Sequence, residues 1–335
     1  MKRIVAPLIF SALCIVFGAC SKEDTNAGKK PSGALRIAVV PKGTSHDYWK
    51  SVHAGALRAA RSDAAIELTF RGPEREDDRD QQISLVQNLI SSKYDGIVLA
   101  PLDSAALAGP VRQAHDAGIP VVIIDSGLQA QAGTEFVSFV ATDNRQGGRM
   151  GGTLLGERIG GKGKVLLLRY MEGSASTTER EEGFLEAIKA MPEVTVIDPG
   201  QFAGATRATA QDAAENLLAI HQDIDGVFCP NESSTFGMLL ALRSKGMSGR
   251  VRFVGFDASE AAVEALRKQE IDGLVLQNPI RMGELGVQTL INHIRGSKQD
   301  VRIDTGVAIV TPANIDDPSM KELVSPDLDE LLRSK

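Results

Sequence analysis

The sequence DGIVLAPLDS at residues 95–104 returns in the second half of the chain as DGVFCPNESS at residues 225–234. Each copy is followed by a further apolar run that ends in an aspartate, IPVVIID closing at Asp125 and VRFVGFD at Asp257. Short apolar runs bounded by turn residues are typical of buried strands. Because this strand pattern occurs once in each half of the chain, the sequence predicts two similar lobes.

Strand and helix patterns alternate along both halves of the chain. The expected strands are residues 35–40, 66–71, 96–100, 121–124 and 136–141, and then 164–168, 194–197, 226–229, 251–256 and 273–277. The expected helices of the first half are residues 48–62, 79–92 and 104–117, the last beginning at Asp103-Ser104 and ending at Asp116-Ala117-Gly118. Such alternation gives right-handed βαβ units. The sequence therefore predicts an α/β fold of two doubly wound parallel-sheet lobes.

The first residues have the order of a secretory signal peptide. A basic start at residues 1–3 and an apolar stretch at 4–17 lead to Gly18 and Ala19, which precede Cys20. This order predicts cleavage before Cys20. A cysteine after two small residues resembles the bacterial lipobox, in which the thiol carries the lipid anchor, although the lipobox usually has leucine where this chain has phenylalanine. An ordinary secreted protein with an incidental cysteine is the alternative.

Residues 20–33 carry the expected lipid site and a polar tether without apolar periodicity. The protein is therefore expected outside the cytoplasm, in the periplasm, held to a membrane only by lipid at Cys20. About 300 residues remain for folding, which is more than one core usually serves. The net charge of −6 has no long run of one sign, which argues against nucleic-acid binding. We expect a monomer.

Several enzyme and cofactor signals fail. The run Gly156–Gly163 nearly spells a phosphate loop, but glycine stands where Ser or Thr must ligate magnesium, and the run precedes a strand. The five histidines have no metal-ligand spacing, and Cys229 lies in an expected buried strand without a nearby histidine. The sequence predicts no catalytic residue, no metal and no cofactor.

Polar residues follow several expected strands at the point where each strand ends. These residues are Asp125, Asn231, Asp257 and Gln277. In open α/β sheets, ligands bind beyond the carboxyl ends of the strands. Any one of the four side chains could be a simple helix cap, but four of them at equivalent strand ends indicate a binding cleft.

From residue 35 to about 311, the chain resembles the periplasmic sugar-binding proteins of the ribose-binding type, the solute receptors of ABC importers. The markers are Tyr48-Trp49, IPVVIID (119–125), ATDN (141–144), TEREEGF (178–184), ENLL (215–218), PNESSTFGM (230–238), VGFD (254–257) and LVLQNP (274–279). The resemblance implies the type I fold, in which three hinge strands join two lobes that close over a sugar. The crossings are expected near Thr142-Asp143, Gln277-Asn278 and Thr305-Gly306.

The resemblance also implies domain boundaries. A signal peptide at 1–19 and the tether at 20–33 precede a first lobe of residues 34–141 and 278–304. The second lobe takes residues 142–277 and 305–325, and residues 326–335 form a C-terminal tail.

Matching positions imply a ligand site for a neutral polyol. Asp125, Asp257 and Arg180 match residues that bind sugar hydroxyls, because a carboxylate accepts and a guanidinium donates hydrogen bonds. Asn231 and Gln277 are the neutral partners in this comparison. Tyr48 and Trp49 match an aromatic pair that stacks on the apolar face of the sugar. Core packing is the alternative for these two rings.

Three departures from the ribose-binding pattern bear on specificity. Ser126 replaces an arginine, and His46 replaces an asparagine. Lys42, in the loop after the first strand, could supply the missing charge, or it could be a solvated loop lysine. The second-lobe aromatic of the family is also absent, since Gly204-Ala205-Thr206 occupies that stretch, which favours a roomier pocket for a hexose or another pyranose.

The sequence therefore predicts a lipoprotein that captures a monosaccharide by lobe closure and delivers it to the transmembrane subunits of an ABC permease. One alternative is a sensor that presents its closed form to a membrane kinase or chemoreceptor. A carbohydrate-acting enzyme is a further alternative, and it would need paired carboxylates across a scissile bond.

Overall fold

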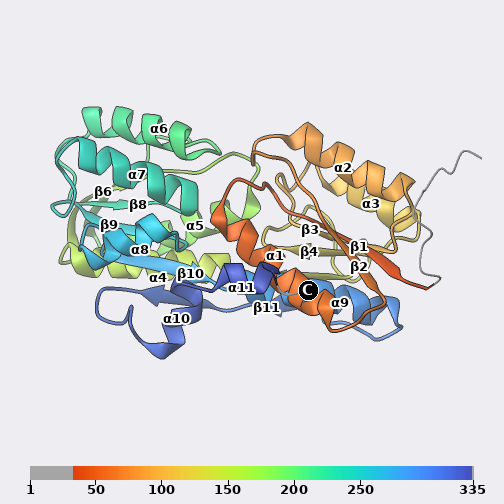
Figure 1. The fold of residues 1–335 in the computed structure, drawn as a ribbon. Helices are drawn as coiled ribbons and strands as arrows, with labels where there is room; N and C mark the ends of the chain where they lie inside the picture. Colours follow the sequence, from red (N-terminus) through yellow and green to blue (C-terminus); the bar gives the residue numbers. More distant parts are fainter. Residues whose placement is uncertain (1–32, 334–335) are drawn as a thin grey trace, which may run out of the picture. The chain divides into compact units, whose positions relative to one another are not determined.

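The computed structural model describes residues 33–333, so the predicted signal peptide and Cys20 lie outside the described residues. Residues 34–333 form one compact unit that contains two six-stranded sheets (Figure 1). In this unit, as far as the structure describes it, no helix is both long enough and apolar enough to span a bilayer.

The first sheet has the strand order β11-β5-β4-β3-β1-β2, and all of its pairings are parallel. Its strands are β1 (Leu35–Val40), β2 (Ile66–Phe70), β3 (Gly96–Leu99), β4 (Val121–Ile124), β5 (Ser138–Ala141) and β11 (Arg302–Asp304). The helices packed around it are α1 (Asp47–Arg61), α2 (Arg79–Ser91), α3 (Ala108–Asp116) and α9 (Pro279–Ile294). We call this sheet with its helices the first lobe.

The second sheet has the order β12-β10-β9-β8-β6-β7, and only β12 is antiparallel to its neighbour. Its strands are β6 (Lys162–Leu167), β7 (Glu193–Ile197), β8 (Gly226–Phe228), β9 (Arg252–Phe256), β10 (Gly273–Gln277) and β12 (Val307–Val310). The helices of this second lobe are α4 (Asn144–Arg158), α5 (Ala175–Lys189), α6 (Arg207–Ile220), α7 (Glu232–Ser244), α8 (Glu260–Arg267) and α10 (Pro318–Val324).

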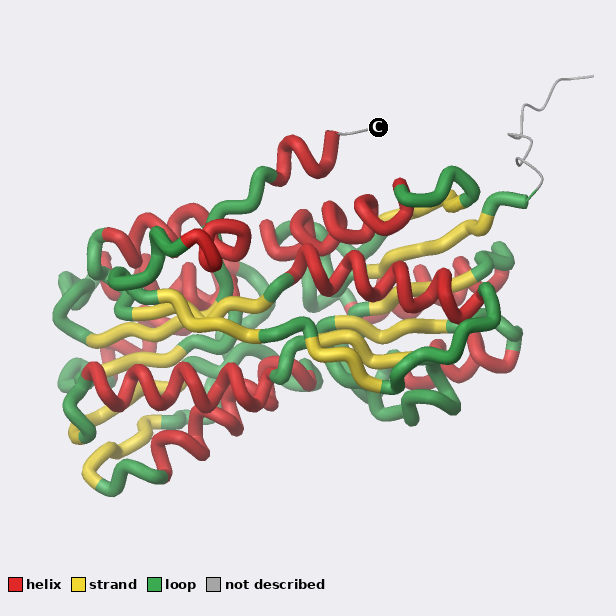
Figure 2. Tube along the Cα trace, turned by 90° about the horizontal axis from the view of Figure 1, so that it is seen from below, coloured by secondary structure: helices red, strands yellow, loops and turns green. Residues whose placement is uncertain are grey.

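Helices cover both faces of each sheet, as Figure 2 shows for strands drawn in yellow between helices drawn in red. Strand β3 illustrates why. Its side chains alternate, so Val98 packs in the cluster with α1 and α9, while Ile97 and Leu99 pack in the cluster with α2 and α3. A strand that is apolar on both faces needs a helical layer on each, which is the doubly wound arrangement that the sequence predicts.

The two lobes repeat the same helix contact. In the first lobe α1 packs on α9, and a Cβ added at Gly55 would lie 1.8 Å from the carbonyl oxygen of Ile280. In the second lobe α4 packs on α5, and a Cβ at Gly148 would lie 2.0 Å from the carbonyl oxygen of Arg180. Only glycine allows backbones this close. The glycine pairs of α4, at residues 147–148 and 151–152, therefore serve packing.

The chain passes from one sheet to the other at three places. These are the links between β5 and α4, between β10 and α9, and between β11 and β12. They include Thr142, Asn278 and Thr305, and the hydroxyls of Thr142 and Thr305 lie 3.2 Å apart. Two of the links therefore run side by side. The exact domain boundaries stay a prediction.

The third helix begins later than the sequence predicts. Residues 104–107 form turns, and α3 starts at Ala108. Asp103 does act as a cap, but for these turns, because its carboxylate accepts hydrogen bonds from the N–H groups of Ala105 and Ala106. The N–H of Ser104 bonds the carbonyl of Gly173 in the second lobe, so this segment is used for contact between the lobes.

The end of the chain makes a further contact that the sequence analysis does not expect. Helix α11 (Leu328–Arg333) lies in the stretch expected as a tail, and it packs on α1 of the first lobe (Figure 1). Arg61 of α1 donates to the carbonyl of Leu331 at 2.6 Å. Since α10 packs on β10 of the second lobe, the segment 318–333 touches both lobes.

Candidate functional site

The site is built on two aspartates in equivalent places. Asp125 follows β4 and Asp257 follows β9, and each has a φ of 65°, in the left-handed region. This conformation is energetically unfavourable for residues other than glycine, and backbone strain of this kind is found most often at functional sites. The backbone thus turns sharply at both strand ends and leaves each carboxylate in the space between the lobes.

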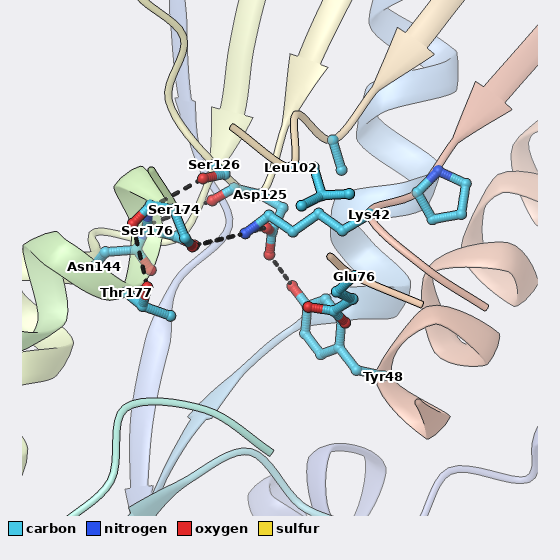
Figure 3. Close-up of polar contacts among 12 residues, drawn as sticks. Lys42, Tyr48, Glu76, Leu102, Asp125, Ser126, Asn144, Ser174, Ser176 and Thr177 are labelled. Carbon is cyan, nitrogen blue, oxygen red and sulfur yellow. Dashed lines mark hydrogen bonds and ion pairs between the residues drawn. The ribbon is translucent and has the colours of Figure 1, made fainter. Parts of the chain in front are cut away.

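Asp125 is paired with Lys42 (Figure 3). The Lys42 Nζ lies 2.9 Å from Asp125 Oδ2, and the Tyr48 hydroxyl donates to Asp125 Oδ1 at 2.9 Å. The Lys42 ammonium also donates to the hydroxyls of Ser176 at 3.0 Å and Ser174 at 3.4 Å in the second lobe. Lys42 is 4% exposed, so it is a buried cleft residue and not a solvated loop lysine. Its three donors have three protein acceptors.

Asp257 lies in a different electrostatic setting. It accepts from the Gln277 amide at 2.8 Å and from the N–H of Glu232 at 3.2 Å. Burial raises the pKa of Asp257 to about 6, the nearby Arg180 opposes this rise, and the Glu232 and Asp125 carboxylates add to it. The carboxylate has no lysine partner of the kind that Asp125 has.

Arg180 projects from α5 and is 2% exposed. Its Nε donates to Asn144 Oδ1 at 2.8 Å, its Nη1 donates to the carbonyl of Pro230 at 2.9 Å, and its guanidinium covers the ring of Phe256 at 4.3 Å. Within the part of the chain that the structure describes, Nη2 has no hydrogen-bond partner. A buried donor of this kind is costly unless a ligand oxygen satisfies it.

Asn231 opens α7 and is occupied as a helix cap. Its side chain accepts from the N–H of Ser234, and the Ser234 hydroxyl completes a capping box. The side-chain amide donates to Ser233 at 3.1 Å. The cap interpretation is therefore correct for this residue, which still lines the cleft.

The aromatic pair at the start of α1 lines the cleft and also joins the core. Trp49 is 3% exposed and packs edge-on against Tyr48, with ring centroids 5.0 Å apart. The indole N–H of Trp49 donates to Glu76 Oε1 at 2.6 Å. His46 Nδ1 lies 2.7 Å from the same oxygen. Burial alone would lower the pKa of the His46 imidazole, but the neighbouring Glu76 carboxylate raises this pKa to about 9.

Glu76, Tyr170 and Glu232 line the site without having been predicted. Glu76 lies in the charged loop between β2 and α2, and burial, which would raise its pKa, is outweighed by His46 and Lys42, so that the pKa falls to about 2. The Tyr170 hydroxyl donates to Glu76 Oε2 at 2.6 Å from the second lobe. Glu232 accepts from the N–H of Tyr48 at 3.2 Å and from Arg207. The marker PNESSTFGM contains Glu232 without having assigned it a role, whereas Glu76 and Tyr170 stand in no marker.

Ser126, the departure from the ribose-binding pattern, contacts protein. Its hydroxyl accepts from the N–H of Ser176 at 3.1 Å across the lobes. Tyr170 lies beside the segment expected to be open, because its carbonyl accepts from the N–H of Gly204 at 3.0 Å. The Tyr170 side chain itself lines the cavity and bonds Glu76.

These residues surround a cavity of about 30 Å³ between the lobes. The lining residues are Lys42, His46, Tyr48, Trp49, Glu76, Asp125, Tyr170, Ser176, Thr177, Arg180, Asn231, Glu232, Asp257 and Gln277. Every predicted site residue except Ser126 lines this cavity. Among residues 33–333, no cluster of His, Cys, Asp and Glu has the arrangement of a metal site.

A family model described as a periplasmic binding protein domain matches residues 37–298. The chain belongs to this family. The family name places its members in the periplasm, in agreement with the predicted location outside the cytoplasm.

Individual relatives match along nearly their whole length. The D-ribose/D-allose-binding protein of Pseudomonas aeruginosa is 29% identical over 92% of this chain and 98% of its own. An ABC transporter solute binding protein from Agrobacterium vitis, solved with bound D-fucose, is 34% identical, with a TM-score of 0.83 over 86% of this chain and 99% of its own. A second from the same organism, bound with α-D-tagatopyranose, is 30% identical, with a TM-score of 0.82 over 87% of this chain and 99% of its own.

These matches confirm the predicted fold class and the resemblance to the ribose-binding type. They identify the chain as a solute-binding protein of the ABC importer type and not as an enzyme.

Proposed function

We propose that this protein binds one neutral monosaccharide in the cleft and delivers it to an ABC permease. The observation that carries the proposal is the unpartnered Nη2 of Arg180, a buried donor in the cavity between the lobes. A sugar hydroxyl there would accept the bond that no described residue accepts. The same hydroxyl can donate to a neighbouring carboxylate.

The charges of the cleft support a neutral ligand. Each acid in the site has a base beside it: Lys42 with Asp125, His46 with Glu76, Arg207 with Glu232, and Arg180 near Asp257. A uronate or an amino sugar would add a buried charge without a partner, and such a charge is strongly unfavourable. Uncharged pentoses and hexoses fit this balance.

The relatives narrow the sugars to test. Those described above are named for D-ribose and D-allose or were solved with D-fucose or D-tagatopyranose. Because Ser126 cannot supply a guanidinium and the Lys42 donors have protein acceptors, we expect a pyranose to bind more tightly than D-ribose. The cavity is lined by mostly buried residues of both lobes, so we expect the lobes to open for a sugar to enter and to close again around it.

The decisive test is a thermal-shift screen of these sugars followed by calorimetry and fluorescence. Trp49 is the single tryptophan and lines the cavity, so a bound sugar should change its emission in a saturable way. Arg180→Ala should weaken binding by about tenfold to a hundredfold, because a charge-assisted hydrogen bond is lost. Arg149→Ala, which removes an exposed arginine on α4, is the matched control. A sugar that binds without altering the emission would argue against stacking on Trp49.

Lipid anchoring at Cys20 is the second part of the proposal, and the order of residues 1–20 supports it. Cys20→Ser should release the protein from the membrane fraction or leave it as an uncleaved precursor. The measurement is fractionation of cells with mass spectrometry of the mature N-terminus. A wild-type mature protein that begins at another residue would contradict the anchor.

A further inference from the structure

Glu76 has a bonding pattern that leaves little capacity for a ligand. Its Oε1 accepts from the Trp49 indole at 2.6 Å and from His46 at 2.7 Å, and its Oε2 accepts from the Tyr170 hydroxyl at 2.6 Å. The residue is 5% exposed. Both oxygens of this carboxylate are therefore engaged by the protein itself.

The third of these bonds joins the two lobes. Glu76 belongs to the loop between β2 and α2 of the first lobe, whereas Tyr170 follows β6 of the second lobe and is 1% exposed. Tyr170 is held in place because its N–H bonds Glu181 Oε1 at 3.0 Å, and Glu181 is itself paired with Arg169 at 2.7 Å. Two fixed groups thus meet across the cleft.

We propose that the Glu76–Tyr170 hydrogen bond is a closing latch, which stabilises the closed form through a bond between the lobes and not through a bond to the ligand. The inference rests on the proposed sugar-binding function. When the lobes separate, water can hydrate both groups, so the bond favours only the closed form. A closed form that is more stable by a given factor binds every ligand more tightly by that factor.

Glu76 also connects the latch to two residues that line the cavity, Trp49 and His46. The carboxylate that receives the Tyr170 hydroxyl also holds the Trp49 indole and the His46 ring. Tyr170 is thus linked to Trp49 and His46 through the Glu76 carboxylate. This arrangement makes Glu76 and Tyr170 positioning residues, in contrast to Arg180, whose free donor can meet the sugar directly.

The test compares Tyr170→Phe with Tyr94→Phe. Tyr170→Phe removes the cross-lobe hydroxyl and leaves the ring, while Tyr94→Phe removes a hydroxyl that bonds Thr69 within the first lobe, away from the cavity. Calorimetry would use D-ribose, D-allose, D-fucose and D-tagatose. Tyr170→Phe should weaken each sugar that binds the wild type by the same factor, about tenfold, and Tyr94→Phe should change none.

Small-angle X-ray scattering of the sugar-free protein gives a readout that a ligand contact would not share, and stopped-flow Trp49 fluorescence adds the dissociation rate of the sugar. Tyr170→Phe should raise the dissociation rate, and the sugar-free variant should have a larger radius of gyration than the sugar-free wild type. Glu76→Gln should have a smaller effect on the latch, because its amide can donate to the Tyr170 oxygen while its carbonyl still accepts from Trp49. Glu76→Gln also covers the case in which Tyr170→Phe fails to fold.

The outcomes separate the two proposals. If no sugar binds the wild type, the proposed function fails, and the scattering comparison alone decides the latch. An unchanged affinity with an unchanged radius overturns the latch. A loss that falls on one sugar and spares another also overturns it, because Tyr170 would then be a ligand contact.

Discussion

Asp125 and Asp257 occupy the same place in the two lobes but have different partners. Both follow a parallel strand, and both have a φ of 65°. Asp125 faces the Lys42 ammonium at 2.9 Å, whereas the bonds to Asp257 come from the Gln277 amide and a backbone N–H. One backbone plan thus carries a fixed ion pair in the first lobe and a carboxylate with a raised pKa in the second.

The difference shows how a repeated fold acquires two kinds of binding group. The strand end fixes where each carboxylate lies, and the surrounding loops supply its partners. In the first lobe Lys42 comes from the loop after β1. A sugar between the lobes would therefore meet a carboxylate paired with an ammonium on one side and a carboxylate with a raised pKa on the other.

The largest expected effect comes from Asp125→Asn. This change removes the carboxylate and leaves the buried Lys42 ammonium without its ionic partner, so sugar affinity should fall by about a hundredfold. Asp257→Asn removes a carboxylate that has no lysine partner, and we expect a loss of about tenfold. Calorimetry on both variants, with circular dichroism to confirm folding, checks the order. Equal losses would show that the two carboxylates act alike.

The next effect is a dependence of binding on pH. Burial raises the pKa of Asp257 to about 6, so this group gains a proton as the pH falls below neutrality. The protonated acid loses an acceptor for sugar hydroxyls, so affinity should fall as pH decreases, by about tenfold between pH 7.5 and pH 5. His46, with a pKa near 9, and Glu76, near 2, keep their charges in this range.

Two variants sharpen the pH experiment. Asp257→Asn should remove most of the dependence, and Asp125→Asn should keep it. The measurement is the dissociation constant from calorimetry at several pH values. A dependence that survives in Asp257→Asn would assign the titration to another group.

The smallest expected effect comes from Lys42→Met. The apolar stem is retained, but the donors to Asp125, Ser174 and Ser176 are lost and the buried Asp125 carboxylate loses its ionic partner, so we expect affinity to fall by about threefold to tenfold and the melting temperature to fall as well. Lys50→Met is the control, because Lys50 lies exposed on α1 and pairs only with Asp47 among the contacts described for it. An unchanged dissociation constant would mean that Lys42 does not contribute to binding.

The fold could be predicted because its signals are local. Strands β1, β4 and β10 have the bounds that the sequence predicts, since each is a short, mainly apolar run that ends at turn or cap residues. The start of α3 could not be predicted in this way. Residues 104–107 are held in turns by Asp103 and by a bond from Ser104 to Gly173, a partner far away in the chain.

The site could be predicted only where residues stand at strand ends or in a family marker. Glu76 was missed because it lies in the run GPEREDDR, which has the composition of a solvated surface loop. Its burial depends on His46, Trp49 and Tyr170, which come from other segments. Tyr170 was missed because its place in the site depends on its contact with Glu76 in the other lobe. Side chains that are defined by contacts between lobes leave no periodic signal in the sequence.

Helix α11 has a mechanical consequence. The first described strand, β1, and the last helix, α11, both contact the first lobe, since α11 docks on α1 through Arg61. While this contact holds, a pull applied between residue 34 and residue 333 is carried within the first lobe. The hinge links at Thr142, Asn278 and Thr305 stay unloaded. A surface attachment or a fused reporter at residue 34 or residue 333 would then load the first lobe, and the link between α10 and α11, which bridges the lobes, would take up the movement of the second lobe.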